Sequence, residues 1–128
     1  MEAQAPSPSR KLTTHQQSVL IQVLLAFPDQ QVGIEHCGAG DASSYARDFL
    51  TIFNAVRWNV AEFGAAKGSA VTTGGLAILV SRNQKLPPSA EALRDALRIY
   101  GIEVETVSDA AREIAAGEFV FSVGALPQ

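Results

Sequence analysis

The feature that constrains the fold most is a pattern that occurs twice along the chain: a strand-like run, an amphipathic helix and a second strand-like run. The first copy covers about residues 31–63 and the second about residues 76–107. In such a β-α-β unit the two strands lie parallel in one sheet, and the helix crosses over one face of it in a right-handed sense. We therefore predict an α/β fold with a mostly parallel sheet of four or five strands.

The individual elements follow one another in the order helix, strand, helix, strand, strand, helix, strand, short helix, strand. The run LAILV at residues 76–80 is apolar throughout, as in a central strand that is buried on both faces. A short helix is expected at residues 108–116 and a last strand at residues 119–123. Helices on both faces of the sheet would make this a three-layer domain of the Rossmann-like or flavodoxin-like kind.

The amino-terminal segment differs in composition from the rest of the chain. The first eleven residues, MEAQAPSPSRK, contain almost nothing that a fold could bury. Residues 1–11 are therefore predicted to form a flexible leader or linker, and residues 12–128 a single α/β domain. With 47% hydrophobic and 18% charged residues, the chain has enough apolar material for one packed core.

The first expected helix stands outside the two β-α-β units. It opens with a threonine followed three residues later by a glutamine, a capping-box pattern that occurs both as Thr13/Gln16 and as Thr14/Gln17. Apolar residues then recur at helical spacing until Pro28. The exposed apolar residues of this helix would serve as a surface for a homo-oligomer or for another protein partner.

Charge and cysteine content exclude several classes of function. Ten basic residues against thirteen acidic ones give a net charge of −3 without any Lys/Arg cluster, so no nucleic-acid partner is expected. One cysteine and two scattered histidines offer neither a disulfide framework nor a metal site, and no cofactor is predicted. No stretch approaches the ~20 apolar residues that span a bilayer, and the chain does not open like a signal peptide. We expect a soluble, cytoplasmic chain that does not itself insert into a membrane.

The most informative local feature is the loop HCGAGDASS, which joins the first strand to the following helix. In open α/β sheets, ligands bind beyond the carboxyl ends of strands, where N–H groups at a helix N-terminus attract anions. Candidate contacts for a small anionic ligand are therefore Gly38, Gly40, Asp41, Ser43 and Ser44. The loop lacks the third glycine and the distal acidic residue of a dinucleotide fingerprint. The competing interpretation is a glycine-eased turn with an Asp or Ser cap.

A further candidate contact, Arg82, follows the third expected strand. If the first and third strands are neighbours, its guanidinium would face the same crevice as the loop and attract an anion. The alternative is an arginine that is solvated at a strand end.

No catalytic residue is predicted. His36 and Cys37 are adjacent on a strand, so their side chains point to opposite faces and are badly placed to act together. Cys37 is best explained as a small core residue, and His15 is expected at the surface. No nucleophile elbow is present.

Short phrases occur along the chain in the order LTTHQQSVLIQVL, FPDQQV, GAGDASSYARDF, W-x-V, LAILV, SAEALRDAL, G-I-x-V and V-G-x-x-P. Over about residues 12–127 this order resembles a loosely defined group of uncharacterised bacterial domains that follow transmembrane helices. Such proteins often have glycine before the tryptophan, as a helix C-cap, where this chain has Arg57. The resemblance implies a domain of unassigned activity, tethered to the inner membrane through a segment absent from this chain.

The sequence therefore predicts a non-enzymatic sensing or protein-interaction domain, the soluble part of a membrane-anchored bacterial protein. The alternative prediction is a small nucleotide- or anion-binding enzyme domain that uses the Gly38–Ser44 loop.

Overall fold

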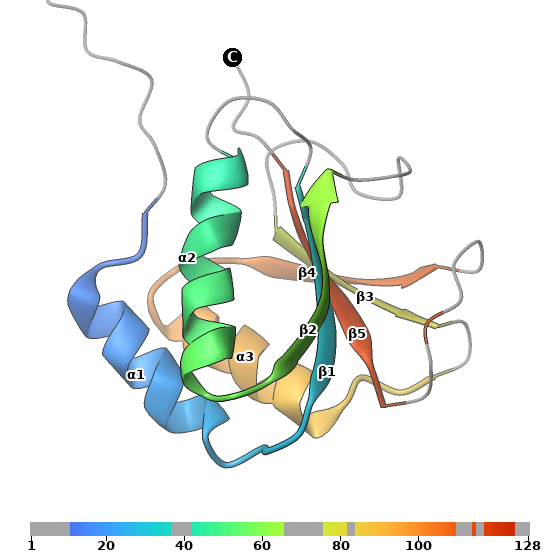
Figure 1. Ribbon diagram of the computed structural model, residues 1–128, viewed down its shortest axis with the longest axis horizontal. Coiled ribbons are helices and arrows are strands. Elements are labelled where there is room, and N and C mark those ends of the chain that lie inside the picture. The colour runs from blue at the N-terminus through green and yellow to red at the C-terminus, as the bar shows by residue number, and fades with distance from the viewer. Residues whose placement is uncertain are drawn as a thin grey trace, which may run out of the picture.

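The computed structural model describes residues 11–36, 42–65, 76–81, 84–109, 114 and 117–124. Within these ranges the chain forms three helices and five strands (Figure 1). In chain order they are α1 (Thr14–Leu24), β1 (Gln31–His36), α2 (Ala42–Ala55), β2 (Asn59–Ala65), β3 (Leu76–Ser81), α3 (Pro88–Ile99), β4 (Val104–Asp109) and β5 (Phe119–Val123).

The five strands form one sheet in the order β2-β1-β5-β3-β4. β1 pairs in parallel with both β2 and β5, and β3 pairs in parallel with β4. The prediction of a mostly parallel sheet in an α/β fold is confirmed, because only the contact between β3 and β5 is antiparallel. Strands β3 and β4 therefore run opposite to the other three.

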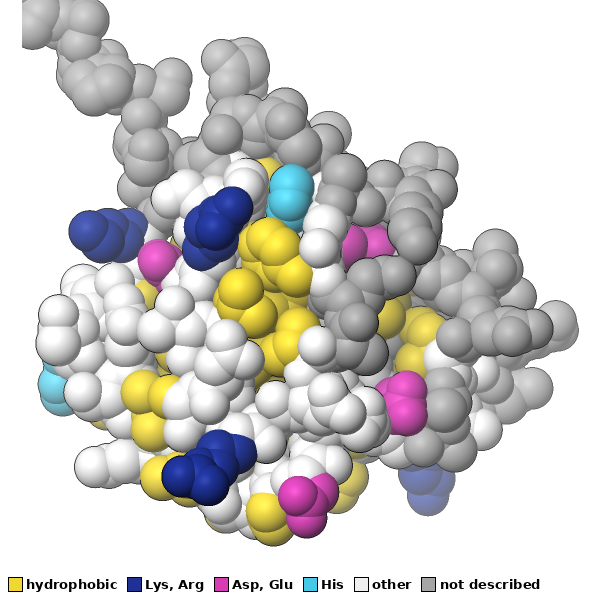
Figure 2. Space-filling model, in the orientation of Figure 1, with side chains coloured by type: hydrophobic (Ala, Val, Ile, Leu, Met, Phe, Trp, Pro, Cys, Tyr) yellow, Lys and Arg dark blue, Asp and Glu magenta, His cyan; other side chains and the backbone are white. Residues whose placement is uncertain are grey.

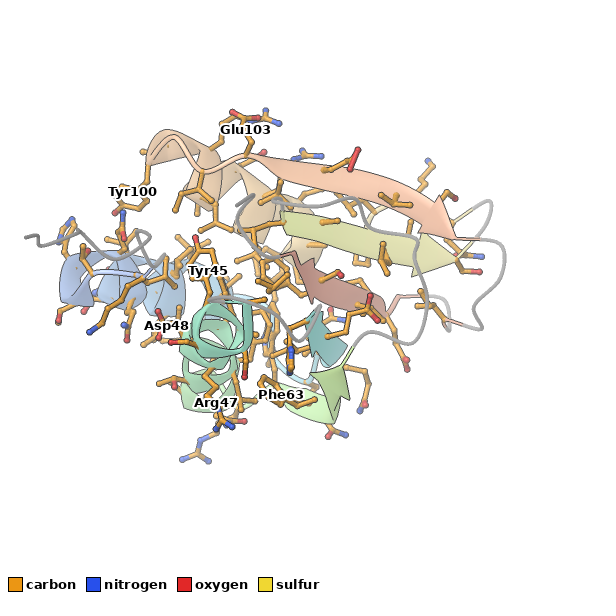
Figure 3. The ribbon with its side chains drawn as sticks, turned by 90° about the horizontal axis from the view of Figure 1, so that it is seen from above. Tyr45, Arg47, Asp48, Phe63, Tyr100 and Glu103 are labelled. Carbon is orange, nitrogen blue, oxygen red and sulfur yellow. The ribbon has the colours of Figure 1, made fainter. Side chains whose placement is uncertain are left out.

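All three described helices lie on one face of this sheet, as the views from the side and from above show (Figures 1 and 3). The expected helices on both faces are not found among the described residues, which form two layers. The reason is the reversal of strand direction. The step from β1 to β2 and the step from β3 to β4 lead toward opposite edges of the sheet. A right-handed crossover stays on the same face of the sheet when both the strand direction and the direction of the step across the sheet are reversed. The helices α2 and α3 therefore lie on the same face.

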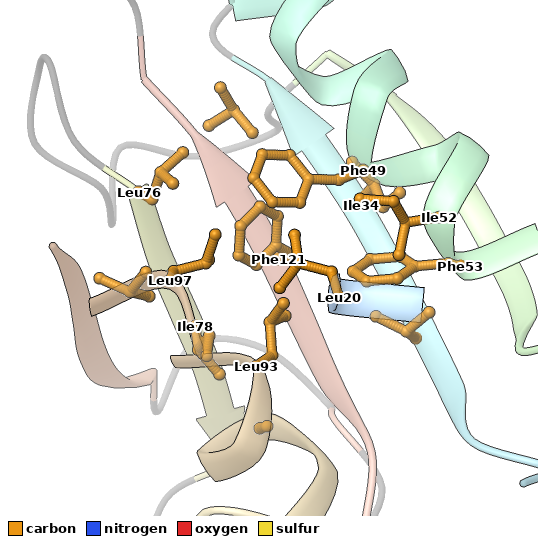
Figure 4. Close-up of a cluster of buried hydrophobic side chains, with 14 of the residues drawn as sticks. Leu20, Ile34, Phe49, Ile52, Phe53, Leu76, Ile78, Leu93, Leu97 and Phe121 are labelled. Carbon is orange, nitrogen blue, oxygen red and sulfur yellow. The ribbon is translucent and has the colours of Figure 1, made fainter. Parts of the chain in front are cut away.

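A single apolar core fills the space between the helices and the sheet (Figure 4). Phe121 of β5 lies near its centre, fully buried, with its ring centroid 4.5 Å from that of Phe49 and 6.0 Å from that of Phe53. Both partners come from α2, where they stand four residues apart and so lie on the same helical face. Trp58 also belongs to the core, and its ring is stacked on that of Phe53 with the centroids 4.9 Å apart.

Strand β3 is buried along its length, as its apolar sequence predicts. Leu76, Ile78 and Val80 belong to the core under the helices. Because strand side chains alternate, Ala77 and Leu79 point to the other face, where they are also buried. The prediction of a short helix at residues 108–116 is wrong at its start, because Ser108 and Asp109 belong to β4. Most of its remaining residues lie outside the described ranges.

The helix ends follow identifiable local rules. The capping box of α1 uses Thr13 and Gln16 rather than the alternative pair, with Gln16 N–H donating to Thr13 Oγ1 at 3.0 Å. Just before it, Leu12 is buried and its N–H donates to Asp48 Oδ2 of α2 at 3.0 Å. At the other end of α2, Arg57 adopts a left-handed backbone with φ 64°. Such a conformation favours glycine, the residue that the resemblance leads one to expect there.

Candidate binding surface beside the first two strands

The predicted ligand loop is only partly described. Ser43 is half-buried and Ser44 exposed, and both lie in the first turn of α2, at the sheet edge where β1 ends. Gly38, Gly40 and Asp41 lie outside the described residues. The interpretation of this loop as a ligand contact, like the competing one of a capped turn, therefore stays a prediction.

Arg82 also lies outside the described residues. The strand order nevertheless tests the premise on which Arg82 was predicted to lie near this loop, namely that the first and third strands are neighbours. That premise is wrong, because β5 lies between β1 and β3 and pairs antiparallel to β3. Val123 is the register partner of both His36, the end of β1, and Leu76, the start of β3. Ser81, which ends β3, therefore lies at the opposite end of the strands, about 16 Å further along the strand direction. The carboxyl ends of these two strands do not share a crevice.

The structure instead brings together three side chains that the sequence did not connect. His36 ends β1, and its ring lies 5.6 Å from that of Phe63 on the neighbouring strand β2. The guanidinium carbon of Arg47, from α2, stands 5.7 Å from the centroid of the same phenyl ring (Figure 3). At this distance a guanidinium is attracted by the negative face of an aromatic ring.

The imidazole of His36 is the polar group in this cluster that is not satisfied. Its Nδ1 atom is buried, and no hydrogen-bond partner for it exists among the residues that the structure describes. Burying a nitrogen without a partner costs about 1–3 kcal/mol. A group of this kind in a native fold calls for an explanation, and the residues that directly follow His36 lie outside the described ranges.

Partly exposed apolar side chains of α2 and β2 continue this cluster. Figure 2 shows a yellow area at the centre of this face, with a histidine and a Lys or Arg side chain above it. Leu50 of α2 and Val60 of β2 are only partly buried there and pack against the core, as Phe63 does. We name His36, Arg47, Leu50, Val60 and Phe63 the α2–β2 patch. It combines apolar side chains with the guanidinium of Arg47 and the imidazole of His36.

A second buried polar pair lies on the face of the sheet without described helices. Ser122 of β5 donates its hydroxyl to Glu35 Oε2 of β1 at 2.9 Å, and both residues are buried. They are register partners on adjacent central strands, so the contact links the middle of the sheet. Glu35 and His36 are consecutive on a strand and point to opposite faces, which separates this pair from the α2–β2 patch.

The remaining candidate groups do not converge on a site. His15 is exposed in the first turn of α1, as predicted, with its ring 6.3 Å from that of Tyr100. Cys37 lies outside the described residues. Over the described ranges, no group of three or more His, Cys, Asp or Glu residues could hold a metal ion. In the same part of the chain, no helix has the length and apolar character needed to cross a membrane.

The described residues form a two-layer α/β fold with an apolar surface beside the edge strand β2, and this surface carries Arg47 and His36. Comparison with protein-family models, with curated proteins and with solved structures found no match to this chain.

Proposed function

We propose that this chain is a non-enzymatic sensing or protein-interaction domain and that the α2–β2 patch is its binding surface. The observation that carries the proposal is the set of partly exposed apolar side chains Leu50, Val60 and Phe63, beside the exposed Arg47 that lies over the Phe63 ring. Apolar surface next to a charged group is a combination that a bound partner stabilises, because it covers the first and can pair with the second.

The alternative, a small nucleotide- or anion-binding enzyme domain, draws support from one feature. Ser43 and Ser44 stand in the first turn of α2, where helix N–H groups attract anions. The premise that placed the cation of Arg82 beside this loop does not hold, because the strand that precedes Arg82 ends at the opposite end of the sheet. A crevice between helices on two faces, where dinucleotides bind in doubly wound sheets, also has no counterpart among the described elements. The interaction domain is therefore preferred.

We further propose that in its native protein the domain follows a membrane anchor and faces the cytoplasm. The support is the resemblance of its sequence phrases to bacterial domains that follow transmembrane helices. Fractionation of cells that express the full-length gene tests this. Recovery of the native protein in the membrane fraction, resistant to high-salt washing, is expected, and recovery in the supernatant would contradict it.

The test of the interaction function combines turnover and binding. The purified chain is incubated with nucleotides, esters and sugar phosphates, and no turnover is expected. Binding of a random heptapeptide pool is then followed by amide NMR shifts, which we expect at the α2–β2 patch and not in α3. The variant Phe63→Ser should lose these shifts, while Ile99→Ser, on an exposed position of α3, should keep them. Turnover of any of these compounds, or shifts that are indifferent to Phe63→Ser, would contradict the proposal.

A further inference from the structure

We infer that a second copy of this chain is a partner of the α2–β2 patch, and that it docks there with the exposed face of α3 around Ile99. This inference rests on the proposed function and names a partner of the same surface. The contact joins two different surfaces, so copies would associate head to tail and not as a symmetric pair.

The chemistry of the patch defines what a partner needs. Its apolar side chains are only partly buried, and the exposed Arg47 places its guanidinium carbon 5.7 Å from the centroid of the Phe63 ring. The acidic residue next to Arg47 in the chain, Asp48, is bonded elsewhere, because its Oδ2 accepts the Leu12 N–H at 3.0 Å. A matching partner therefore presents a large apolar side chain beside a carboxylate.

The chain itself presents this combination on α3. Among the described residues, two large hydrophobic side chains are exposed, Leu25 at 56% and Ile99 at 82%. Leu25 follows α1, which contains no acidic residue. Ile99 ends α3, and Asp95 stands four residues before it with its side chain 60% exposed. Ile99 together with Asp95 is therefore the better match to the patch.

The geometry of α3 keeps this acid and this apolar side chain on one face. A helix turns by about 100° per residue, so Asp95 lies about 40° around the helix axis from Ile99. The basic residues of the same helix, Arg94 and Arg98, lie about 140° and 100° away from Ile99. Arg94 Nε donates to Asp95 Oδ1 at 3.1 Å. An ion pair at the surface contributes little, so the carboxylate remains available to the guanidinium of another copy.

One copy cannot bring its own two surfaces together. The strand order places β2 at one edge of the sheet and β4 at the other. The patch includes β2, whereas α3 packs against β4. Figure 3 shows the same separation, with Tyr100, the residue after Ile99, at the top of the view and Arg47 and Phe63 at the bottom. The contact is therefore one between copies, and each copy offers both halves of it.

The experiment follows the ¹⁵N-labelled chain by amide NMR during dilution. A contact of this size lies below the ~1,200 Å² of stable complexes, so we expect a dissociation constant of about 0.1–1 mM. Dilution through this range should shift the amides of the patch and of the last turn of α3 together. Ile99→Ser and Phe63→Ser should each lose these shifts. An equimolar mixture of the two variants should regain them, because one variant keeps the patch and the other keeps Ile99.

Charge reversal tests the pairing of Arg47 with Asp95. Arg47→Glu and Asp95→Arg should each weaken the association about tenfold, and the double variant should restore it because the two charges are exchanged. The control Glu91→Arg makes the same change at another exposed position of α3 and should leave the dissociation constant unchanged.

Several results would overturn the inference. Shifts that do not depend on concentration up to the millimolar range would remove the second copy as a partner. A mixture of Ile99→Ser and Phe63→Ser that stays unassociated would show that the two surfaces do not contact each other. A double variant as weak as the single ones would show that Arg47 and Asp95 do not pair. In each of these cases the patch still binds the heptapeptide pool, so the proposed function stands. Absence of peptide binding to Ile99→Ser, whose patch no copy covers, would count against the proposed function itself.

Discussion

Two helices of this domain end in the same hydrogen-bonded motif, but with different residues at its left-handed position. In α2, the N–H groups of Arg57 and Trp58 donate to the carbonyls of Asn54 and Phe53 at 3.0 and 2.9 Å. In α3, Gly101 and Ile102 donate in the same way to residues 98 and 97, at 2.9 and 3.0 Å. The φ angles of Arg57 and Gly101 are 64° and 76°. The arginine therefore occupies a conformation in which glycine is preferred.

We predict that Arg57→Gly stabilises the domain. A residue with a Cβ atom destabilises the folded state by about 1–2 kcal/mol when it adopts the left-handed region. Glycine lowers the free energy of unfolding by about 0.5–1 kcal/mol, because it gives the unfolded state extra conformational entropy. The difference is a gain of roughly 0.5–1 kcal/mol, or about 2–6 °C in Tm. The exposed Arg57 side chain should contribute little against this. The reverse change, Gly101→Ala, should destabilise by about 1 kcal/mol. A Cβ at Gly101 would meet nothing within 4 Å, so that loss would be conformational and not steric.

Urea unfolding followed through Trp58 measures both effects, because this buried residue is the only tryptophan in the chain. The control Arg57→Ala removes the side chain and keeps the Cβ, so it should stay within about 0.5 kcal/mol of the parent. The reasoning is refuted if Arg57→Gly is no more stable than Arg57→Ala. It is equally refuted if Gly101→Ala leaves the free energy of unfolding unchanged, because both outcomes deny that the φ angle sets the stability.

Three other perturbations test the core, the sheet and the first helix by the same unfolding measurement. Phe121→Ala should destabilise by about 3–5 kcal/mol, because it empties the centre of the aromatic cluster, and a loss below about 1.5 kcal/mol would contradict that placement. Ser122→Ala should lose about 1–3 kcal/mol, since it removes a donor from the buried Glu35 carboxyl group. The loss should shrink in a Glu35→Leu background if the pair itself is its source. Thr13→Ala should lose about 1 kcal/mol and Thr14→Ala much less, because only Thr13 caps α1; equal losses would argue against the capping box.

Most of the elements of this fold could be predicted from the sequence, because they are set by local patterns. The apolar run of β3, the helical spacing of α2 and the capping box of α1 each act over a few residues. The direction of β3 relative to β1 has no such local signal. It depends on the insertion of β5 between them, and β5 is the last strand in the sequence. Among the described helices the expected second layer is not found because of this reversal, although the strands of both predicted β-α-β units pair in parallel as expected.

The candidate site shows the same limit. His36 could be weighed from the sequence only against its neighbour Cys37, which lies outside the described residues. The ring neighbour of His36, Phe63 of β2, is 27 residues away, and Arg47 of α2, which contacts the same phenyl ring, is 11 residues away. The alternation of β2 predicts that Phe63 faces one side of the sheet, but its contact with His36 requires the register of two strands. Pair contacts of this kind are fixed by packing, which one sequence does not reveal.

The reversal of strand direction also decides which kind of binding this fold favours. In a doubly wound sheet, helices on both faces leave a crevice at the strand ends, and small ligands enter it. Here α2 and α3 share a face, their N-termini follow strands that end at opposite edges, and their dipoles cannot act on one ligand. What the arrangement leaves beside α2 is the edge strand β2, whose outer side has no partner strand among the described residues and whose Phe63 ring contacts Arg47 and His36. An edge of this kind is matched by another backbone and not by a nucleotide, which supports the proposal that the partner of this domain is a protein segment.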